Sequence, residues 1–186
     1  MRTIGCASRN LVALAALIAA VICCAAVGRA SASGAVRLQQ LPGHWRSDEG
    51  RDVELTEFEG HRVVLTMAYA TCHRICPLTM TALQSIQERL DLRGEAADFV
   101  IVGYDPANDD AAAWHQYRTA RHLTRSNWHF LTGSSDATAE LARQLGFDFW
   151  KYDDHVMHDS RVVVFDSHGI LQAALGPDTR DWSKAL

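Results

Sequence analysis

Cysteine is scarce in the part of the sequence that has the composition of a folded domain. Three of the five cysteines fall within the first 24 residues, and only Cys72 and Cys76 follow them. Two cysteines are too few for a structural zinc site built from four cysteines. A disulfide between them would close a loop of only five residues, and such short loops give the least entropic stabilisation. The pair therefore indicates chemistry at the two sulfur atoms rather than a staple for the fold.

Basic residues are scarce as well, and they form no cluster. The chain has 18 lysines and arginines against 22 aspartates and glutamates, a formal net charge of −4. Residues 1–32 contain three arginines and no acidic residue, so the net charge of residues 33–186 is −7. An acidic domain without a basic patch is a poor match for nucleic acid. We expect no nucleic-acid partner.

Long apolar runs are absent except near the N-terminus, where Leu11–Val27 carries no charge. Arg2 and Arg9 precede this run, and an Ala-Ser-Ala sequence ends at residue 32. A basic start, an apolar run and a small-residue cleavage site are the three parts of a secretory signal peptide. We expect residues 1–32 to be a signal peptide that directs the protein to the bacterial periplasm or the outer face of the inner membrane. Because the run has only 17 residues, close to the lower limit for crossing a bilayer, an uncleaved membrane anchor is the alternative.

The remaining sequence predicts one domain, residues 44–186, preceded by a linker over residues 33–43. Apolar runs and helix-start signals alternate along the domain. Strands are expected over residues 52–58, 62–69, 99–104, 128–131, 161–165 and 170–175, and helices over 76–92, 109–123 and 134–145. The first two strands and the last two should each form a hairpin. Strands that alternate with helices predict an α/β fold with a largely parallel centre and an antiparallel edge.

Cys72 and Cys76 lie between the strand expected over residues 62–69 and the start of the following helix. The unpaired N–H groups and the dipole of a helix N-terminus favour thiolates, and Arg74 adds a positive charge nearby. A thiolate binds soft metals and also attacks disulfides, so metal and redox chemistry compete at this pair. The C-x-x-x-C spacing differs from the C-x-x-C of redox motifs and the C-x-x-C-H of haem attachment. A metal bound here needs a third ligand from elsewhere, for which histidine is the usual choice.

Two of the nine histidines, His155 and His158, lie in the loop expected just before the strand at residues 161–165. In an α/β sheet of this order, that loop can reach the carboxyl end of the strand that leads to the cysteines, where ligands of open sheets gather. His73, between the cysteines, is a candidate for an additional ligand. The other six are expected to be solvated or to serve packing: His44, His61, His115, His122, His129 and His168.

Four segments of the sequence, in this order, resemble the Sco/SenC family of copper proteins between residues 43 and 176. Met67–Pro77 is similar to the family's strand and C-x-x-x-C-P motif, and Gly103–Asp109 is similar to its D-P-x-x-D segment. Phe130–Gly133 resembles its L-T-G segment, and His158, followed by a strand and an Asp-x-x-Gly turn, resembles its copper-binding histidine. The resemblance implies a thioredoxin-like fold, which agrees with the α/β architecture expected from the strands and helices: a central mixed sheet flanked by helices, with an N-terminal β-hairpin.

The resemblance also implies a site for one copper ion, as Cu(I) or Cu(II), with Cys72, Cys76 and His158 as its ligands. This set suits the metal, because thiolates favour Cu(I) and imidazole suits both oxidation states. His158 fits the family's spacing to the Asp-x-x-Gly turn better than His155 does. Asp105 either shapes the site from outside the ligand shell or caps a turn.

The function implied by the resemblance is that of a monomeric copper metallochaperone rather than an enzyme. Its partner would be cytochrome c oxidase subunit II, to whose CuA site it would deliver copper or whose cysteines it would reduce. The sequence departs from the family's pattern at Ala70, where threonine is usual, and at Met157, where aspartate is usual. These departures leave the three ligands in place.

Two other functions would use the same residues. An exported thiol–disulfide oxidoreductase would use Cys72 and Cys76 as its redox pair, and the sequence assigns no catalytic residue beyond that pair. The C-x-x-x-C spacing weighs against it, and so does the lack of a proline before the strand expected to face the cysteines, where thioredoxin-like oxidoreductases carry a cis-proline. A copper-responsive redox signalling module would use the same three ligands, so that binding to subunit II would have to separate it from a metallochaperone.

Overall fold

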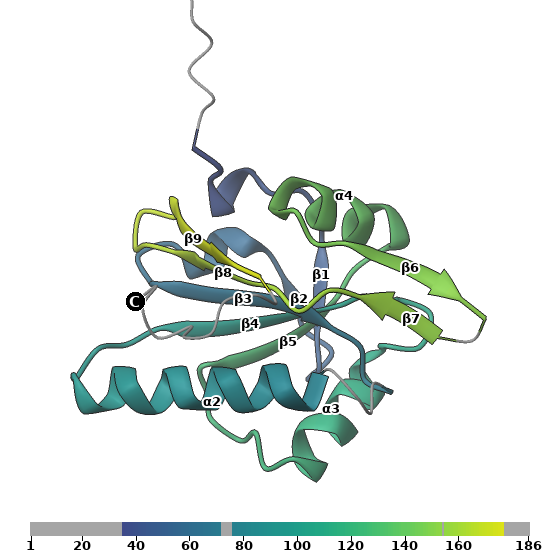
Figure 1. The fold of residues 1–186 in the computed structure, drawn as a ribbon, viewed down its shortest axis with the longest axis horizontal. Helices are drawn as coiled ribbons and strands as arrows, with labels where there is room; N and C mark the ends of the chain where they lie inside the picture. The colour runs from purple at the N-terminus through teal and green to yellow at the C-terminus, as the bar shows by residue number, and fades with distance from the viewer. Residues whose placement is uncertain (1–34, 72–75, 154, 177–186) are drawn as a thin grey trace, which may run out of the picture. The chain divides into compact units, whose positions relative to one another are not determined.

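The centre of the domain is a seven-stranded mixed sheet with helices on both of its faces (Figure 1). The computed structural model describes residues 35–71, 76–153 and 155–176. The strand order is β2-β1-β5-β4-β3-β8-β9. In chain order these strands are β1 Trp45–Ser47, β2 Asp52–Val53, β3 Val63–Ala68, β4 Asp98–Gly103, β5 Trp128–Thr132, β8 Val162–Phe165 and β9 Leu171–Leu175. The helices are α2 Cys76–Leu92, α3 Ala111–Ala120 and α4 Ser135–Leu145, with short 3-10 helices η1 Leu38–Gln40 and η2 Leu55–Phe58. The predicted α/β architecture with a mixed central sheet is confirmed.

The middle of the sheet is formed by β3 and β4, which run parallel. All six residues of β3 are buried, as are five of the six residues of β4. Continuous apolar runs of this kind are typical of parallel strands that are covered on both faces. The two strands pair from Val63 opposite Asp98 to Ala68 opposite Gly103. They therefore end level with each other, at the edge of the sheet where the chain leaves β3 toward Cys72.

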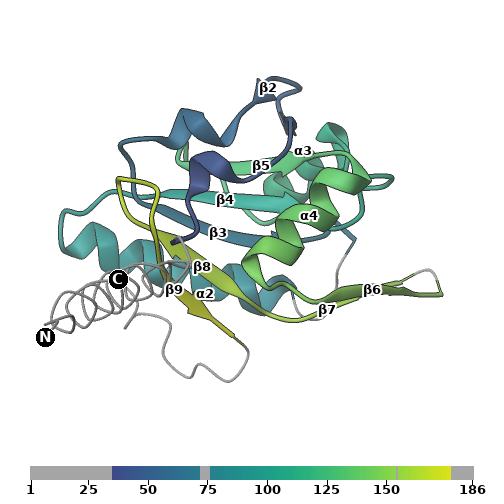
Figure 2. The same ribbon diagram turned by 90° about the horizontal axis from the view of Figure 1, so that it is seen from above.

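Two apolar layers cover the sheet. Helices α2 and α3 cover one face, where Leu83 and Trp114 pack with Phe130 of β5 (Figures 1 and 2). Helix α4 covers the other face together with η1 and η2, where Leu141 and Leu38 pack into a second buried cluster. The sheet is thus shielded on both sides, and only its edges and strand ends can present a site to solvent.

The ends of α3 and α4 follow the predicted capping signals. The Asp110 carboxylate accepts a hydrogen bond from the Ala113 N–H (2.8 Å), and the Ser134 hydroxyl accepts one from the Ala137 N–H (3.2 Å). Such side chains satisfy backbone donors that the first helical turn leaves unpaired. Gly146 ends α4 with a φ of 70°, a left-handed conformation that glycine adopts readily. The predicted bounds of α4 are confirmed to within one residue, whereas α3 is shorter than the predicted 109–123 at both ends, since Asp110 is its N-cap and Arg121 its C-cap.

The first predicted strand, residues 52–58, is wrong beyond its first two residues. Asp52–Val53 is the strand β2, but Leu55–Phe58 forms the helix η2. Glu54 and Glu57 form a capping box, in which each side chain binds the backbone N–H of the other, and this arrangement winds the chain into a helical turn. The predicted hairpin with β3 is also wrong, because β2 pairs with β1 while β3 pairs with β4 and β8. The N-terminal hairpin of the fold is therefore β1–β2.

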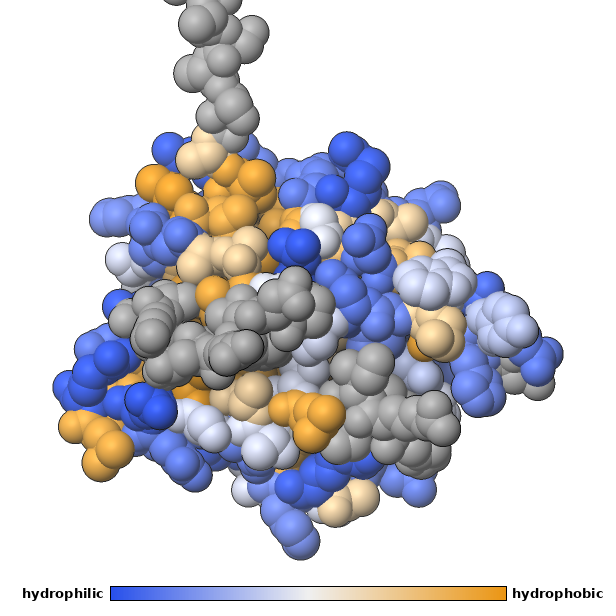
Figure 3. Space-filling view, viewed as in Figure 1, coloured by the Kyte–Doolittle hydropathy of each residue, from blue (hydrophilic) through white to orange (hydrophobic). Residues whose placement is uncertain are grey.

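A separate two-stranded sheet joins α4 to β8 and contains both candidate histidines. Its strands, β6 Phe149–Tyr152 and β7 His155–His158, pair antiparallel, so the predicted loop around His155 and His158 is wrong. Strands of four residues that mix aromatic, charged and histidine side chains give too little alternation to be predicted. Figures 1 and 2 show this hairpin extending beyond the seven-stranded sheet, and Figure 3 shows pale side chains of intermediate hydropathy over it.

The chain already packs against the domain before residue 44. Leu38 is fully buried, and its N–H donates a hydrogen bond to the carbonyl of Gly169 (2.8 Å). The N–H of Leu171 donates in turn to the carbonyl of Val36 (3.0 Å). This part of the predicted linker (residues 33–43) therefore belongs to the packed domain.

The predicted signal peptide or membrane anchor, residues 1–32, lies outside the described residues. Within the described ranges, no helix combines the length and the apolar character that crossing a membrane requires.

The buried position of Leu38 predicts a large effect of Leu38→Ala on stability. Removing a fully buried leucine side chain from a core costs about 2–5 kcal/mol in the free energy of unfolding. Chemical denaturation should show this loss, while the neighbouring exposed change Arg37→Ala should stay within about 0.5 kcal/mol of the natural chain. Equal stabilities of the two variants would show that residues 36–41 act as a linker after all.

Candidate metal centre

The structure describes one of the three predicted ligands in full and the backbone of a second. His158 is the last residue of β7, and its side chain is buried, with 8% of the residue exposed. Cys76 is the first residue of α2. Cys72 and the additional candidate His73 lie outside the described residues. Among the described residues, the candidate centre consists of His158 and the first turn of α2.

His158 lies at the carboxyl edge of the two central parallel strands. Its imidazole meets the ring of Tyr69 edge-on, with centroids 5.6 Å apart, and lies 4.8 Å from the ring of Tyr104. Tyr69 follows directly on β3, and Tyr104 follows directly on β4. The structure thus brings His158 to the edge at which a third ligand is expected from the sequence.

One hydrogen bond determines which nitrogen of His158 can bind a metal. Nδ1 lies 2.6 Å from the carbonyl oxygen of Asp159. A carbonyl can only accept, so Nδ1 carries the proton and, in the neutral imidazole, Nε2 carries the lone pair. Metal-binding histidines commonly donate their other N–H to a backbone carbonyl in this way, which holds the ring in one orientation. The described geometry of His158 therefore fits a metal ligand that binds through Nε2.

The segment that follows His158 is tied to the helix that begins with Cys76. The hydroxyls of Ser160 and Thr79 lie 3.1 Å apart, and the Thr66 hydroxyl of β3 donates to the carbonyl of Arg161 (2.6 Å). Thr79 stands three residues after Cys76, within the first turn of α2. The first turn of α2 contains no acidic residue, so the positive end of its dipole is not neutralised within that turn. Cys76 and His158 thus belong to elements that converge on one edge of the sheet.

The two candidate histidines of β7 lie on opposite faces of that strand. Residues 155 to 158 are alternately exposed and buried, as expected for a strand with a period of two. His155 therefore faces outward, and only His158 is buried toward Tyr69 and Tyr104. The structure separates the two histidines where the sequence alone left both within reach of the cysteines.

A buried carboxylate, Asp109, holds the segment that leads to Cys72. Its two oxygens accept hydrogen bonds from the backbone N–H groups of Ala70 (2.7 Å) and Asp105 (2.8 Å), and only 1% of the residue is exposed. Gly103 leaves room for it, because a Cβ at that position would lie 2.9 Å from the carboxylate. Burial raises the pKa of Asp109 to about 6, although the two backbone hydrogen bonds act in the opposite direction.

Asp109, rather than Asp105, is the acidic residue that braces this edge. The side chain of Asp105 accepts a hydrogen bond from the Asn108 amide (2.8 Å) and lies 3.8 Å from the ammonium of Lys151. These contacts fit the turn role considered for Asp105, and its role outside the ligand shell stays a prediction because Cys72 lies outside the described residues. Both aspartates belong to the D-P-x-x-D segment, so the sequence contained the signal, but only the fold reveals which of the two is buried.

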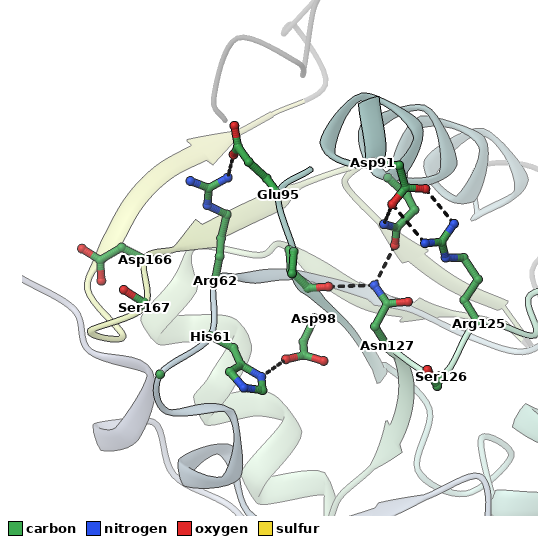
Figure 4. A pocket seen from close by; sticks show the side chains of 14 residues that line it. His61, Arg62, Asp91, Glu95, Asp98, Arg125, Ser126, Asn127, Asp166 and Ser167 are labelled. Carbon is green, nitrogen blue, oxygen red and sulfur yellow. Dashed lines mark hydrogen bonds and ion pairs between the residues drawn. The ribbon is translucent and has the colours of Figure 1, made fainter. Parts of the chain in front are cut away.

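The large cavity shown in Figure 4 lies at the opposite edge of the sheet, where the parallel strands begin. It has a volume of about 900 Å³, and two ion pairs line it, Arg62 with Glu95 and Arg125 with Asp91. The carboxylate of Asp98, which lines the cavity, lies 2.5 Å from Nδ1 of the exposed His61 and 2.9 Å from Nε2 of His129. Burial of Asp98 acts to raise its pKa, but the hydrogen bonds from His129 and His61 outweigh this and lower it. This cavity is separate from the edge that holds His158.

Within the described residues, no three side chains of histidine, cysteine, aspartate and glutamate gather closely enough to hold a metal ion. A metal at the His158 edge would therefore need the cysteine pair, of which Cys72 is outside the described ranges.

Comparison with known proteins settles the family. The SCO1/SenC family model matches residues 42–184, more than three quarters of the chain. The chain belongs to the SCO1/SenC family. Among its relatives are the SCO1 protein homolog of Bacillus subtilis, 26% identical over 69% of this chain and 68% of that protein, and the mitochondrial SCO2 homolog of Danio rerio, 28% identical over 77% of this chain and 50% of that protein.

Solved structures of SCO1/SenC proteins share the fold. Arabidopsis thaliana ScoI with copper bound superposes with a TM-score of 0.68 at 21% identity, over 77% of this chain and 90% of that chain. A SCO1/SenC family lipoprotein from Bacillus anthracis gives a TM-score of 0.71 at 16% identity, over 82% and 92% of the two chains. Yeast Sco1 with copper bound gives 0.66 at 20% identity, over 77% and 82%. The predicted thioredoxin-like fold of this SCO1/SenC chain is confirmed.

The raised pKa of Asp109 predicts a distinct pH dependence of stability. A carboxyl that is harder to ionise when folded favours the folded state below its unfolded pKa, and this contribution is lost as the pH rises through the folded value of about 6. Relative to Asp109→Asn, which cannot ionise, the natural chain should lose up to about 3 kcal/mol of stability between about pH 4 and pH 7. Urea denaturation at several pH values measures this difference.

Asp110→Asn is the matched control for that experiment, because it changes the adjacent aspartate and keeps an N-cap residue on α3. Its stability curve should stay much closer to that of the natural chain than the Asp109→Asn curve does, because the charge of Asp110 is the smallest contribution to the raised pKa of Asp109. Parallel curves for Asp109→Asn and the natural chain would contradict a raised pKa at Asp109.

Proposed function

We propose that this protein binds one copper ion through Cys72, Cys76 and His158. The observation that carries the proposal is the position of His158, which is buried at the carboxyl edge of β3 and β4 between the rings of Tyr69 and Tyr104. Its strand is tied through Ser160 to the first turn of the helix that Cys76 begins.

The donor set fits copper better than other common metals. Thiolates prefer Cu(I), and imidazole accepts both Cu(I) and Cu(II). Structural zinc sites are closed by four protein ligands, of which this set supplies three. The structures of Arabidopsis thaliana ScoI and of yeast Sco1 are of those proteins with copper bound. The shared family supports the same cargo for this chain.

We further propose that the protein acts as a metallochaperone on cytochrome c oxidase subunit II, on the outer side of a bacterial inner membrane. A related structure concerns BsSco, a member of the Sco family of cytochrome c oxidase assembly proteins. The protein would hand copper to the CuA site or reduce the cysteines that form it. The N-terminal segment, with its basic start and apolar run, supports export as a cleaved or an anchored protein.

A thiol–disulfide function for the same pair is the second candidate, and one observation favours it. The BsSco structure identifies a disulfide switch in that protein. Closing Cys72 and Cys76 as a disulfide would release two electrons and two protons to an acceptor disulfide, which becomes two thiols. The same step would remove both thiolates from copper, so the redox state of the pair would decide whether metal can bind.

The copper proposal predicts that His158→Ala loses the metal site. The natural chain should bind one equivalent of copper, and its Cu(II) form should show a thiolate-to-copper charge-transfer band. His158→Ala should weaken binding by at least about tenfold and abolish or shift that band, because one of three ligands is lost. The change His168→Ala, at an exposed histidine in the β8–β9 turn, should alter neither. Equal copper binding in His158→Ala and His168→Ala would overturn the assignment of His158.

The two routes by which the protein could act on subunit II can be separated with the same variant. The reduced natural chain, loaded with copper, is mixed with a soluble CuA domain whose cysteines form a disulfide, and metal and thiols on that domain are then counted. His158→Ala should still reduce the disulfide but deliver no copper, whereas Cys72→Ser with Cys76→Ser should do neither. If neither copper nor thiols appear on the domain with the natural chain, the role in CuA assembly is wrong.

A further inference from the structure

The outward face of the β6–β7 hairpin carries side chains that can bind a soft cation. Because exposed and buried residues alternate along β7, His155 and Met157 share the outer face, while Val156 and His158 share the inner one. An imidazole and a thioether therefore stand two residues apart on one exposed surface, directly beside the candidate ligand His158 in the sequence.

Aromatic side chains of β6 lie opposite these two donors. Trp150 pairs with Met157, and Tyr152 pairs with His155. Side chains that oppose each other directly in an antiparallel pair have Cβ atoms about 4.5–5.5 Å apart, so an indole is the immediate neighbour of the thioether. The four residues form what we term the outer hairpin face.

The outer hairpin face is rich in apolar side chains that are exposed and do not pack into the core. Five large apolar side chains are exposed among the described residues, and three of them stand on this one hairpin: Trp150 (55%), Tyr152 (72%) and Met157 (42%). Figure 3 shows pale side chains gathered over the projecting hairpin, beside strongly hydrophilic neighbours. Exposed apolar residues that cluster rather than scatter usually mark an interaction site.

We propose that His155 and Met157, with the indole of Trp150, form an acquisition site for Cu(I). A thioether is a soft donor that suits Cu(I), and imidazole binds it as well. Their Cα atoms are about 7 Å apart along the strand, a gap that the flexible methionine side chain can close. The face of an indole attracts a cation held next to it. This inference rests on the proposed copper function and adds to it the route by which the ion arrives.

The position of the outer hairpin face suits a transfer to the buried site. Among the described strands, β7 pairs only with β6, so its other edge is not covered by a strand. An ion can pass around that edge from the outer to the inner face, where His158 follows Met157. Two neutral donors hold Cu(I) more weakly than two thiolates and an imidazole, so the ion moves toward the tighter site. It remains Cu(I) throughout, and no electron is transferred.

The acquisition site is tested in the full chain with Cys72→Ser and Cys76→Ser, which removes both thiolates. Titrated anaerobically with Cu(I) against a chromophoric chelator, this protein should retain one ion with a dissociation constant on the order of micromolar. Adding Met157→Leu, which keeps the size of the side chain but removes its sulfur, should weaken that binding by at least about tenfold. His155→Ala should have the same effect, while the buried control Met80→Leu should have none.

A second measurement uses Ag(I), which has the coordination preferences of Cu(I) but does not oxidise. In the thiol-free chain with labelled methionine methyl groups, Ag(I) should shift the Met157 signal and leave those of the buried Met67 and Met80 in place. In the natural chain, Met157→Leu should slow copper uptake from a weak chelate several-fold without changing the final affinity.

The outcomes separate this inference from the proposed function. If the thiol-free chain binds no Cu(I), or if Met157→Leu binds it as well as Met80→Leu does, the acquisition site is wrong while the three-ligand site stands. Slower delivery to subunit II in Met157→Leu, with Cu(I) binding unchanged, would identify the outer hairpin face as a protein-docking surface and would also overturn it. If the thiol-free chain binds Cu(I) but the natural chain shows no tighter site, the proposed function fails, and the outer hairpin face is a Cu(I)-binding surface with no site to supply.

Discussion

The in-register parallel pairing of β3 with β4 is the constraint on which the candidate centre depends. The ladder ends with Ala68 opposite Gly103, and the Tyr104 N–H extends it by donating to the Ala68 carbonyl (2.8 Å). Tyr69 and Tyr104 therefore leave the sheet side by side and supply the two rings that surround His158. A slip of the pairing by one residue would turn the side chains of one strand to the opposite face and would dismantle this enclosure.

The elements that sequence predicted well are those with a single physical interpretation. A buried apolar run such as β3, or a capped helix such as α4, has a pattern of apolar residues that fits only one type of secondary structure. The prediction for the segment after Val53 was wrong because its apolar residues suit both a strand and a helical turn. The capping box of η2 favours the helical turn. The strands β6 and β7 were not predicted because they are short and largely exposed, so their sequences contain too few apolar residues to show a pattern.

The candidate site could be predicted in its ligand types but not in its bracing. The cysteine spacing and the resemblance named His158 ahead of His155, and the alternation along β7 adds the physical reason, because His155 faces outward. Asp109 belongs to the D-P-x-x-D segment, whose sequence suits an ordinary turn. Its importance follows from its burial against Gly103 of β4, which only the fold reveals. Because Asp109 holds the backbone N–H of Ala70 rather than its side chain, the residue at that position can differ from the threonine usual in the family without loss of this contact.

The two-stranded sheet that carries His158 has only four residue pairs. Isolated hairpins of that size are marginal in water, so β6 and β7 depend on what their inner face touches, including the contact between Tyr104 and Phe149. An ion bound to His158 would add an anchor at the base of this hairpin and raise the free energy of its local opening. The amide protons of β6 and β7 would then exchange with solvent more slowly in the copper-loaded protein. Hydrogen exchange of this hairpin would therefore report metal binding without an optical signal.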